Sequence, residues 1–277
     1  MAIRYRSVLD HGIEPSAALV TRGFSDYYVP ITLTGASLLT MVRQDSVDLE
    51  SSRIAFLDDV PVGVAFIARR GWTTRLAAMA LIPEARTQGV GEHCVRLVMD
   101  EARARGERTM VLEVIEQNDR AKRLYERCGF RTVGRLVGYE GAVAGGGGAA
   151  EAPVPVDVHE VARALIAHGP TDLPWQLSGE TLGQAVPPAR GYRSEHAWIA
   201  ISDPAAPKVG VRALVTVPEA RRRGAASSLL RAVMAQHPDR TWRVPAIWPE
   251  HYGGLFEKLG LPRSELTQWL MSAALTV

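Results

Sequence analysis

Several features that define other protein classes are scarce in this sequence. Its 277 residues include only two cysteines, Cys94 and Cys128, which excludes a fold that depends on disulfides. Apolar residues make up 47% of the chain but form no run of the ~18 residues that a membrane span requires. The seven histidines show neither zinc-finger nor H-E-x-x-H spacing. We therefore expect a globular protein with no metal and no membrane partner, and a cytoplasmic one because no secretory signal follows Met1.

An excess of either charge is also missing. Residues 1–144 hold 19 Lys+Arg and 18 Asp+Glu, and residues 145–277 hold 13 and 12, so each half carries a formal charge of +1. No basic tail or strongly basic domain is present. The sequence therefore argues against a nucleic-acid partner, and it leaves the oligomeric state open.

The clearest break in the chain is GAVAGGGGAAEAPVPV, Gly141–Val156. Four consecutive glycines followed by two prolines favour neither a helix nor a central strand. We expect a Gly/Ala-rich linker at residues 145–151 that joins two domains, residues 1–144 and residues 152–277. A long hairpin loop inside one domain is the alternative.

The sequence on either side of this break repeats. LIPEARTQGVGEHCVRLVM (Leu81–Met99) matches TVPEARRRGAASSLLRAVM (Thr216–Met234) at an offset of 135 residues. LYERCGF (Leu124–Phe130) matches LFEKLGL (Leu255–Leu261) at an offset of 131. Two matched segments in the same order indicate tandem copies of one domain, not a solenoid of short repeats.

The first half alternates strand and helix patterns, which predicts an α/β (α+β layered) fold. The expected strands are Ile3–Val8, Arg53–Leu57, Pro61–Arg69, Arg75–Ile82, Met110–Ile115 and Phe130–Tyr139. The expected helices are Pro15–Arg22, Thr34–Arg43, Glu92–Arg105, and one that Asn118 caps and that runs to Cys128.

The end of the first copy is open to several interpretations. No good closing strand precedes the glycines, whereas Thr267–Leu275 provides one for the second copy. The first domain ends open, uses Ala152–Val158, or borrows a strand from its neighbour.

The most informative segment is the loop Arg86-Thr-Gln-Gly-Val-Gly91, between a strand and a helix. Gly89 and Gly91 let the backbone approach a ligand closely. The helix that follows presents unsatisfied amides and a positive dipole end, which suit an anion and especially a pyrophosphate. The loop matches neither the phosphate loop G-x-x-x-x-G-K-[ST] nor the dinucleotide motif G-x-G-x-x-G.

R-x-x-G-x-G between a strand and a helix resembles the acetyl-CoA loop of the GNAT superfamily of N-acetyltransferases. N-x-x-A-x-x-x-Y-x-x-x-G-F, from Asn118 to Phe130, follows a strand and is similar to that family's second signature. The resemblance covers roughly residues 75–139. It implies two GNAT-like domains, each a mixed, mostly antiparallel central sheet flanked by helices. It also implies direct transfer of an acetyl group from the co-substrate acetyl-CoA to a primary amine of a small molecule or peptide.

The resemblance assigns the cofactor site as well. The loop amides hold the pyrophosphate, and the pantetheine arm pairs with the strand before the loop. The residues implied to bind the cofactor are Met79, Ala80, Leu81, Arg86, Thr87, Gln88, Gly89, Val90, Gly91 and Asn118. A splay between Arg75–Ile82 and Met110–Ile115 admits the thioester, and a free backbone amide near Leu81 stabilises the oxyanion.

Tyr125 is the catalytic residue that the resemblance implies. A phenol with a pKa near ~10 is a weaker acid than a thiol near ~8.5, so full proton transfer costs about 2 kcal/mol. We interpret Tyr125 as a hydrogen-bond donor to the leaving thiolate, with complete transfer if its pKa is depressed; aromatic packing is the alternative. Glu113 is the first choice for the base that takes the amine proton, with Glu116 and Asp26 as alternatives.

Phe24, Asp26, Tyr27 and Tyr28 lie between the two early helices, where the family usually builds the acceptor floor. An aromatic wall for an apolar or cationic substrate is one interpretation of this segment. Packing of the rings under the loop is the other.

The second copy keeps R-x-x-G-x-A, a second CoA loop formed by Arg221, Arg222, Arg223, Gly224, Ala225 and Ala226. Pro249 and Phe256 stand at the Asn and Tyr positions and lack their polar groups, so we expect the first copy to be the catalytic one. Two other functions stay open. One is a CoA-binding regulatory or scaffold protein with little turnover, and the other is an acyltransferase that uses a longer acyl-CoA.

Overall fold

The computed structural model describes residues 2–142 and 152–275. Its chain forms two compact units: unit 1 consists of Met1–Val133 with Leu270–Val277, and unit 2 of Gly134–Trp269. The expected linker, residues 145–151, lies outside the described residues.

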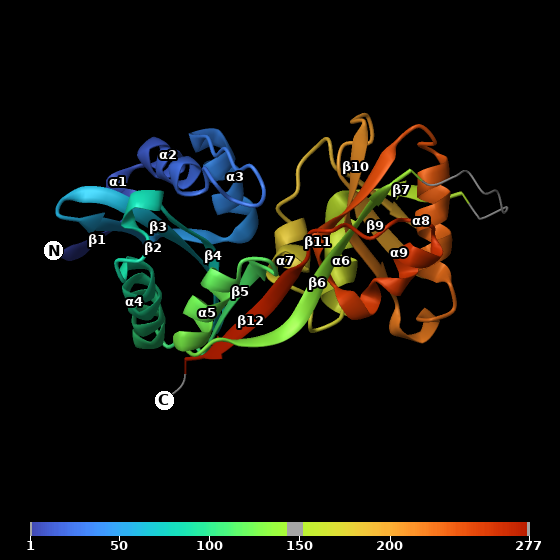
Figure 1. Cartoon of the computed structure of the whole chain (residues 1–277). Helices are drawn as coiled ribbons and strands as arrows, with labels where there is room; N and C mark the ends of the chain where they lie inside the picture. The colour runs from blue at the N-terminus through green and yellow to red at the C-terminus, as the bar shows by residue number, and fades with distance from the viewer. Residues whose placement is uncertain (1, 143–151, 276–277) are drawn as a thin grey trace. The chain divides into compact units, whose positions relative to one another are not determined.

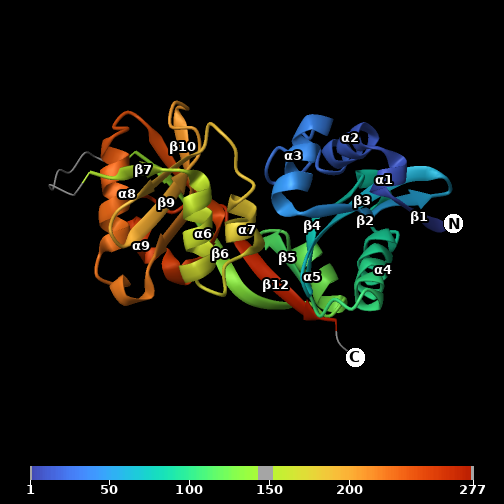
Figure 2. The same ribbon diagram turned by 180° about the vertical axis from the view of Figure 1, so that it is seen from behind.

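Unit 1 has the mixed, mostly antiparallel sheet that the resemblance implies. Strands β1 to β4 form antiparallel neighbours, and β5 pairs parallel with β4. Helices α2 and α3 cover one face of the sheet, and α4 and α5 cover the other (Figure 1 and Figure 2). The elements are β1 (Ile3–Ser7), α1 (Val8–His11), α2 (Ile13–Gly23), α3 (Gly35–Asp45), β2 (Val47–Leu57), β3 (Val60–Arg70), β4 (Thr73–Leu81), η1 (Pro83–Ala85), α4 (Val90–Ala104), β5 (Thr109–Ile115), α5 (Asp119–Arg127) and the start of β6 (Arg131–Gly141).

Local sequence explains these elements. Helix α4 buries Cys94, Val95, Val98 and Ala102, which recur at helical spacing, and it ends just before Gly106 adopts a left-handed φ of 84°. Helix α5 begins because the Asn118 side chain accepts a hydrogen bond from a backbone amide in the first turn.

Strand β2 contains an irregularity that polar side chains close. Its register with β3 shifts between Asp48 and Arg53. The Ser52 hydroxyl donates to the Asp48 carbonyl at 2.6 Å and accepts from the Ile67 amide at 2.9 Å. The Asp48 carboxylate accepts from the Ser51 amide at 3.1 Å. The backbone groups that the bulge removes from the ladder therefore keep partners.

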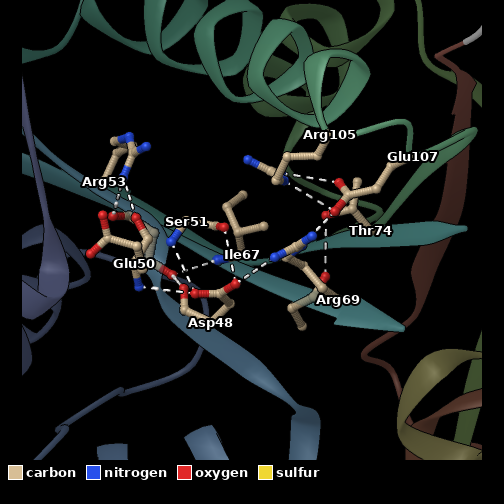
Figure 3. A network of polar contacts seen from close by, with 11 residues as sticks. Asp48, Glu50, Ser51, Arg53, Ile67, Arg69, Thr74, Arg105 and Glu107 are labelled. Carbon is tan, nitrogen blue, oxygen red and sulfur yellow. Dashed lines mark hydrogen bonds and ion pairs between the residues drawn. The ribbon is translucent and has the colours of Figure 1, made fainter. Parts of the chain in front are cut away.

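Arg69 extends this arrangement toward β5 (Figure 3). Its guanidinium donates to Asp48 at 2.8 Å and to Glu107 at 2.5 Å, and Arg105 donates to Glu107 at 3.0 Å. Burial opposes the charged form of Glu107, but the hydrogen bonds from Arg105 and Arg69 outweigh it and lower the pKa of that carboxyl. Because Glu107 precedes Thr109, the network fixes the end of the sheet at which β5 begins.

Unit 2 repeats the plan of unit 1. Strands β7 to β10 are antiparallel neighbours, β11 pairs parallel with β10, and β6 pairs antiparallel with β11. Ile199 and Ile201 belong to the apolar cluster of α8, whereas Ala200 belongs to that of α6, so these helices cover opposite faces. The elements are β7 (Val154–Val156), α6 (Val158–His168), η2 (Trp175–Leu177), α7 (Gly179–Leu182), β8 (Arg190–Arg193), β9 (Ala197–Ile201), β10 (Lys208–Thr216), η3 (Pro218–Ala220), α8 (Ala225–Ala235), β11 (Thr241–Pro249), η4 (Glu250–Tyr252), α9 (Gly254–Lys258) and the start of β12 (Gln268–Ala274).

The two halves of the chain exchange their closing strands. Strand β6 belongs to unit 2 from Gly134 onward, where it pairs with β11. Strand β12 belongs to unit 1 from Leu270 onward, where it is the neighbour of β5, and the Leu275 amide donates to the Arg108 carbonyl at 2.9 Å. The compact units therefore do not follow the sequence ranges 1–144 and 152–277. Of the three alternatives for the end of the first copy, the borrowed strand is the one observed.

This exchange predicts that residues 1–144 alone will be poorly soluble or inactive. The fragment lacks β12, whose Met271, Ala273 and Leu275 are buried, and it exposes the edge of β5. Expression yield and thermal unfolding of the fragment, compared with the full chain, measure the effect. Addition of a fragment of residues 152–277 should restore part of the stability. Cooperative unfolding of residues 1–144 at the full-length temperature would contradict this account.

Candidate functional site

The site begins where β4 and β5 part. Their parallel pairing covers only three residue pairs, of which the last is Arg75 with Val111, although β4 continues to Leu81 and β5 to Ile115. Beyond Arg75, the edge of β4 that faces β5 is not used by the β5 ladder. Backbone groups on such an edge can pair with a bound ligand.

The glycine loop lies at the end of β4. Thr87 and Gly89 adopt positive φ angles of 69° and 79°, which turn the backbone into α4. Gly89 is the N-cap of this 15-residue helix and offers no side-chain cap, so the first amides are left for another acceptor. A Cβ on Gly91 would lie 3.4 Å from side-chain atoms of Met79, Leu81 and Leu124. The loop therefore combines free amides with a close approach to β4.

A cavity of about 640 Å³ opens between these elements. This volume is within the usual range for a small-molecule site. The cavity brings together most of the residues that the sequence predicts for the site, from β4, the glycine loop, α5 and the segment after α2. Its lining residues are Gly23, Phe24, Asp26, Tyr27, Tyr28, Met79, Ala80, Leu81, Arg86, Thr87, Gly89, Gly91, Glu92, Asn118, Arg120, Ala121, Leu124, Tyr125 and Arg127.

Gln88 and Val90 are not among the lining residues. The Gln88 side chain donates to the Glu84 carbonyl at 2.7 Å, and Val90 is fully buried. Sequence reasoning, in turn, missed Glu92, Arg120 and Arg127. The helical spacing of Arg120 and Arg127 with Leu124, on the same helix as Tyr125, was the signal that could have found them.

Arg86 contacts the protein backbone and a carboxylate. Its Nε donates to the Leu81 carbonyl at 3.2 Å, and its Nη2 donates to the Gly23 carbonyl at 3.0 Å. Both Asp26 oxygens accept from Arg86, at 2.6 and 2.7 Å. Hydrogen bonding to Arg86 lowers the pKa of Asp26, so this carboxylate stays charged and paired. Arg86 therefore ties the segment after α2 to the end of β4.

Asn118 lies at the opposite wall. Its Oδ1 accepts from the Ala121 amide at 3.1 Å and caps α5. Tyr28 donates from its hydroxyl to the Gln117 carbonyl at 2.9 Å. The segment that holds Asp26 and Tyr28 thus contacts the residues that follow both β4 and β5.

Tyr125 lies on α5 with 8% of its surface exposed, and its ring contacts Phe130 edge-on at 5.9 Å. Burial raises the pKa of Tyr125, and the nearby Tyr27 adds to the shift. The phenol is therefore neutral at physiological pH and able to donate. This direction is the opposite of the depressed pKa that complete proton transfer requires.

Glu113 is not among the cavity's lining residues. It forms an ion pair with Arg75 at 2.7 Å, in which the two side chains are only 4% and 5% exposed. Arg75 also contacts Asp45 at 3.4 Å. The structure does not support the interpretation of Glu113 as the base, because a guanidinium holds its carboxylate inside the protein.

Unit 2 repeats the loop geometry. Arg222 and Gly224 have φ angles of 61° and 91° and precede α8, and β10 and β11 pair parallel over three residue pairs. Arg221 donates to the Thr216 carbonyl at 3.5 Å and to the carbonyl of His168, the last residue of α6. These contacts match those of Arg86 with Leu81 and with the last residue of α2.

Phe256, at the position that corresponds to Tyr125, is fully buried. Its ring contacts Trp248 at 5.0 Å and Tyr139 at 5.3 Å, with ring centroids as the reference points. Unit 2 therefore retains the turn into its helix, but at the position of the phenol it has an apolar ring that belongs to the core.

Comparison with known proteins agrees with this geometry. The model of the acetyltransferase (GNAT) family matches residues 26–130. A GCN5-related N-acetyltransferase from Sphaerobacter thermophilus aligns with a TM-score of 0.71 and 15% identity over 99% of this chain and 96% of that one. A tandem GNAT protein from the clavulanic acid biosynthesis pathway aligns with a TM-score of 0.69 and 12% identity over 100% and 99%. No curated protein matches in sequence.

The family match identifies an acyltransferase. More narrowly, residues 26–130 match the GNAT acetyltransferase family. The whole chain has the fold of tandem GNAT proteins. Among residues 2–142 and 152–275, no helix is both long and apolar enough to cross a membrane.

The loop geometry predicts that Gly89→Glu abolishes binding of acetyl-CoA to unit 1. Nothing lies within 4 Å of a Cβ at this position, so the carboxylate reaches the space in front of the helix amides and repels a pyrophosphate. Calorimetric titration measures the loss. Gly224→Glu is the matched control in unit 2 and should leave the unit 1 site intact. Unchanged affinity in a folded Gly89→Glu protein would remove the loop from the site.

The buried ion pair predicts that Glu113→Gln lowers the free energy of unfolding by about 2 to 3 kcal/mol, because Arg75 loses the shorter of its contacts with Glu113 and Asp45 inside the protein. Urea denaturation measures this change. Glu126→Gln, which breaks an exposed pair with Lys122, is the control and should cost less than about 1 kcal/mol. An unchanged stability together with the loss of the acidic limb of the pH–rate profile would instead restore Glu113 as the base.

Proposed function

We propose that this protein transfers the acetyl group of acetyl-CoA directly to a primary amine of a small molecule or peptide, and that unit 1 is the catalytic unit. The observation that carries the proposal is the position of Tyr125. A neutral, buried phenol lines the same cavity as the free amides of the glycine loop and the unpaired edge of β4.

The cofactor has a matching surface for each of its parts. The amides of Thr87 to Gly91 would donate hydrogen bonds to the pyrophosphate, and the α4 dipole favours its charge. The edge of β4 from Met79 to Leu81 is placed to pair with the pantetheine arm. The Leu81 carbonyl is used by Arg86, so the arm must rely on the other backbone groups.

The reaction needs no covalent enzyme intermediate. The neutral amine attacks the thioester carbonyl, a C–N bond forms and the C–S bond breaks. The nitrogen gives up a proton to water, and the leaving sulfur gains one. A backbone amide on the free edge of β4 would stabilise the oxyanion, and the Tyr125 hydroxyl would donate a hydrogen bond to the thiolate. The high pKa of Tyr125 favours this donation over complete proton transfer.

The second CoA loop, Arg221–Ala226, is proposed to bind the cofactor without catalysis. Arg222 and Gly224 reproduce the backbone turn, but Pro249 and Phe256 supply neither the amide side chain nor the hydroxyl.

An assay of thioester consumption across a panel of amines tests the function, with calorimetric titration of CoA alongside it. Release of CoA that depends on one class of amine is the expected result. Tight binding of CoA with no turnover on any amine would favour a regulatory protein.

We expect Tyr125→Phe to reduce turnover by roughly 10- to 1,000-fold while the affinity for acetyl-CoA is nearly kept, because the lost hydrogen bond acts on the leaving group. Initial rates and calorimetry on the same preparation measure the two effects. Phe256→Leu is the control in unit 2, and it should change stability more than turnover because this ring is part of an apolar core. The reverse pattern would assign catalysis to unit 2.

A further inference from the structure

Tyr27 is a second phenol in the cavity that contains Tyr125. It follows α2 and is half-buried. Its ring packs edge-on against those of Phe24 and Tyr28, with distances of 4.7 and 5.4 Å between the ring centroids. Because each neighbour in the segment also lines the cavity, the ring is supported from both sides and its hydroxyl has a defined direction.

The segment that carries Tyr27 is anchored on each side of it. Before Tyr27, both oxygens of Asp26 accept from Arg86 at 2.6 and 2.7 Å, and Arg86 also holds the Gly23 carbonyl at 3.0 Å. After Tyr27, the Tyr28 hydroxyl donates to the Gln117 carbonyl at 2.9 Å. These contacts hold Tyr27 between the end of β4 and the start of α5.

The Tyr27 hydroxyl is free to act in the cavity. Among residues 2–142 and 152–275, no side chain or carbonyl lies within hydrogen-bond distance of it, and the nearby Asn118 Oδ1 already accepts from the Ala121 amide at 3.1 Å. A phenol can donate its proton. The proton of Tyr27 is therefore left for a group in the cavity that this residue lines.

We propose that Tyr27 donates a second hydrogen bond, beside that of Tyr125, to the sulfur of bound CoA. The inference rests on the proposed function, which places the thioester between β4 and β5. Asn118 caps the helix on which Tyr125 lies, and all three residues line the same cavity. Two donors that converge on one sulfur share its negative charge when the C–S bond breaks.

Burial keeps this second phenol protonated. It raises the pKa of Tyr27, an effect that the nearby Asn118 side chain only partly opposes. Tyr27 is therefore protonated and able to donate, as Tyr125 is.

The test compares CoA with desulfo-CoA, which lacks the sulfur, and it needs no knowledge of the acceptor amine. Both ligands are titrated calorimetrically across a range of pH, and the pKa of the bound CoA thiol is read from the ultraviolet absorbance of the thiolate. We expect Tyr27→Phe to raise the pKa of the bound thiol and to weaken binding of the thiolate by about 10-fold, the effect of one hydrogen bond to a charged group. Desulfo-CoA should bind equally to both proteins.

Tyr125→Phe and the double variant, Tyr27→Phe with Tyr125→Phe, complete a double-mutant cycle. Tyr125→Phe should also raise the pKa of the bound thiol, and the double variant should raise it more than either change alone. Tyr5→Phe, on β1, is the control from outside the cavity. The Tyr5 hydroxyl contacts the His93 ring at 2.9 Å, and Tyr5 is not among the cavity's lining residues, so its loss should leave the pKa of the bound thiol unchanged.

The outcomes separate this inference from the proposed function. If Tyr27→Phe weakens CoA and desulfo-CoA equally, or leaves the pKa of the bound thiol unchanged, Tyr27 only packs and the inference is overturned while CoA binding stands. If the wild-type protein binds neither ligand, the proposed function is overturned and the role of Tyr27 with it.

Discussion

Only three residue pairs join β4 and β5, and the separation of the strands beyond Arg75 is the constraint on which the site depends. A sheet that continued its pairing would use the backbone edge that the cavity now presents. The polar network of Asp48, Arg69 and Glu107 holds the sheet at the end where β5 begins. The strands are thus closed at one end and open at the other. The opening lies at the glycine loop, where helix amides without partners favour an anion.

Because the chain holds two copies of one domain, residues that both units share can be told apart from residues that only unit 1 has. Arg86 and Arg221 both donate to a carbonyl at a helix end and to one at a strand end, so this arginine belongs to the architecture of both units. Unit 1 adds Asp26, which turns the same guanidinium into an anchor for the aromatic segment. A fold-supporting arginine has in this way acquired a second role next to the cavity.

Local patterns predicted the elements well because each depends on residues close in sequence. The period of α4, the cap at Asn118 and the turn at Gly89 are all visible within one or two helical turns. The partners of charged side chains are not visible in this way. Arg86 meets Asp26 across 60 residues, and Arg75 meets Glu113 across 38, so the sequence could not show that these carboxylates were already occupied.

The identity of a strand's neighbour is equally hidden. The apolar pattern of residues 267–275 predicts a strand in any sheet that offers an edge, and β12 indeed forms over Gln268–Ala274. Whether that edge belongs to its own copy or to the other one is decided by chain connection and by packing, which periodicity does not report.

The exchanged strand has a consequence for synthesis of the protein. A ribosome makes the glycine loop and Tyr125 long before β12 (Gln268–Ala274), whose residues from Leu270 onward close unit 1. Contacts between residues so far apart slow folding, because the loop between them must close first. The N-terminal half must therefore wait, with the edge of β5 uncovered, until β12 leaves the exit tunnel. A chain that stops before β12 cannot complete unit 1, and its uncovered sheet edge makes it a substrate for chaperones and proteases.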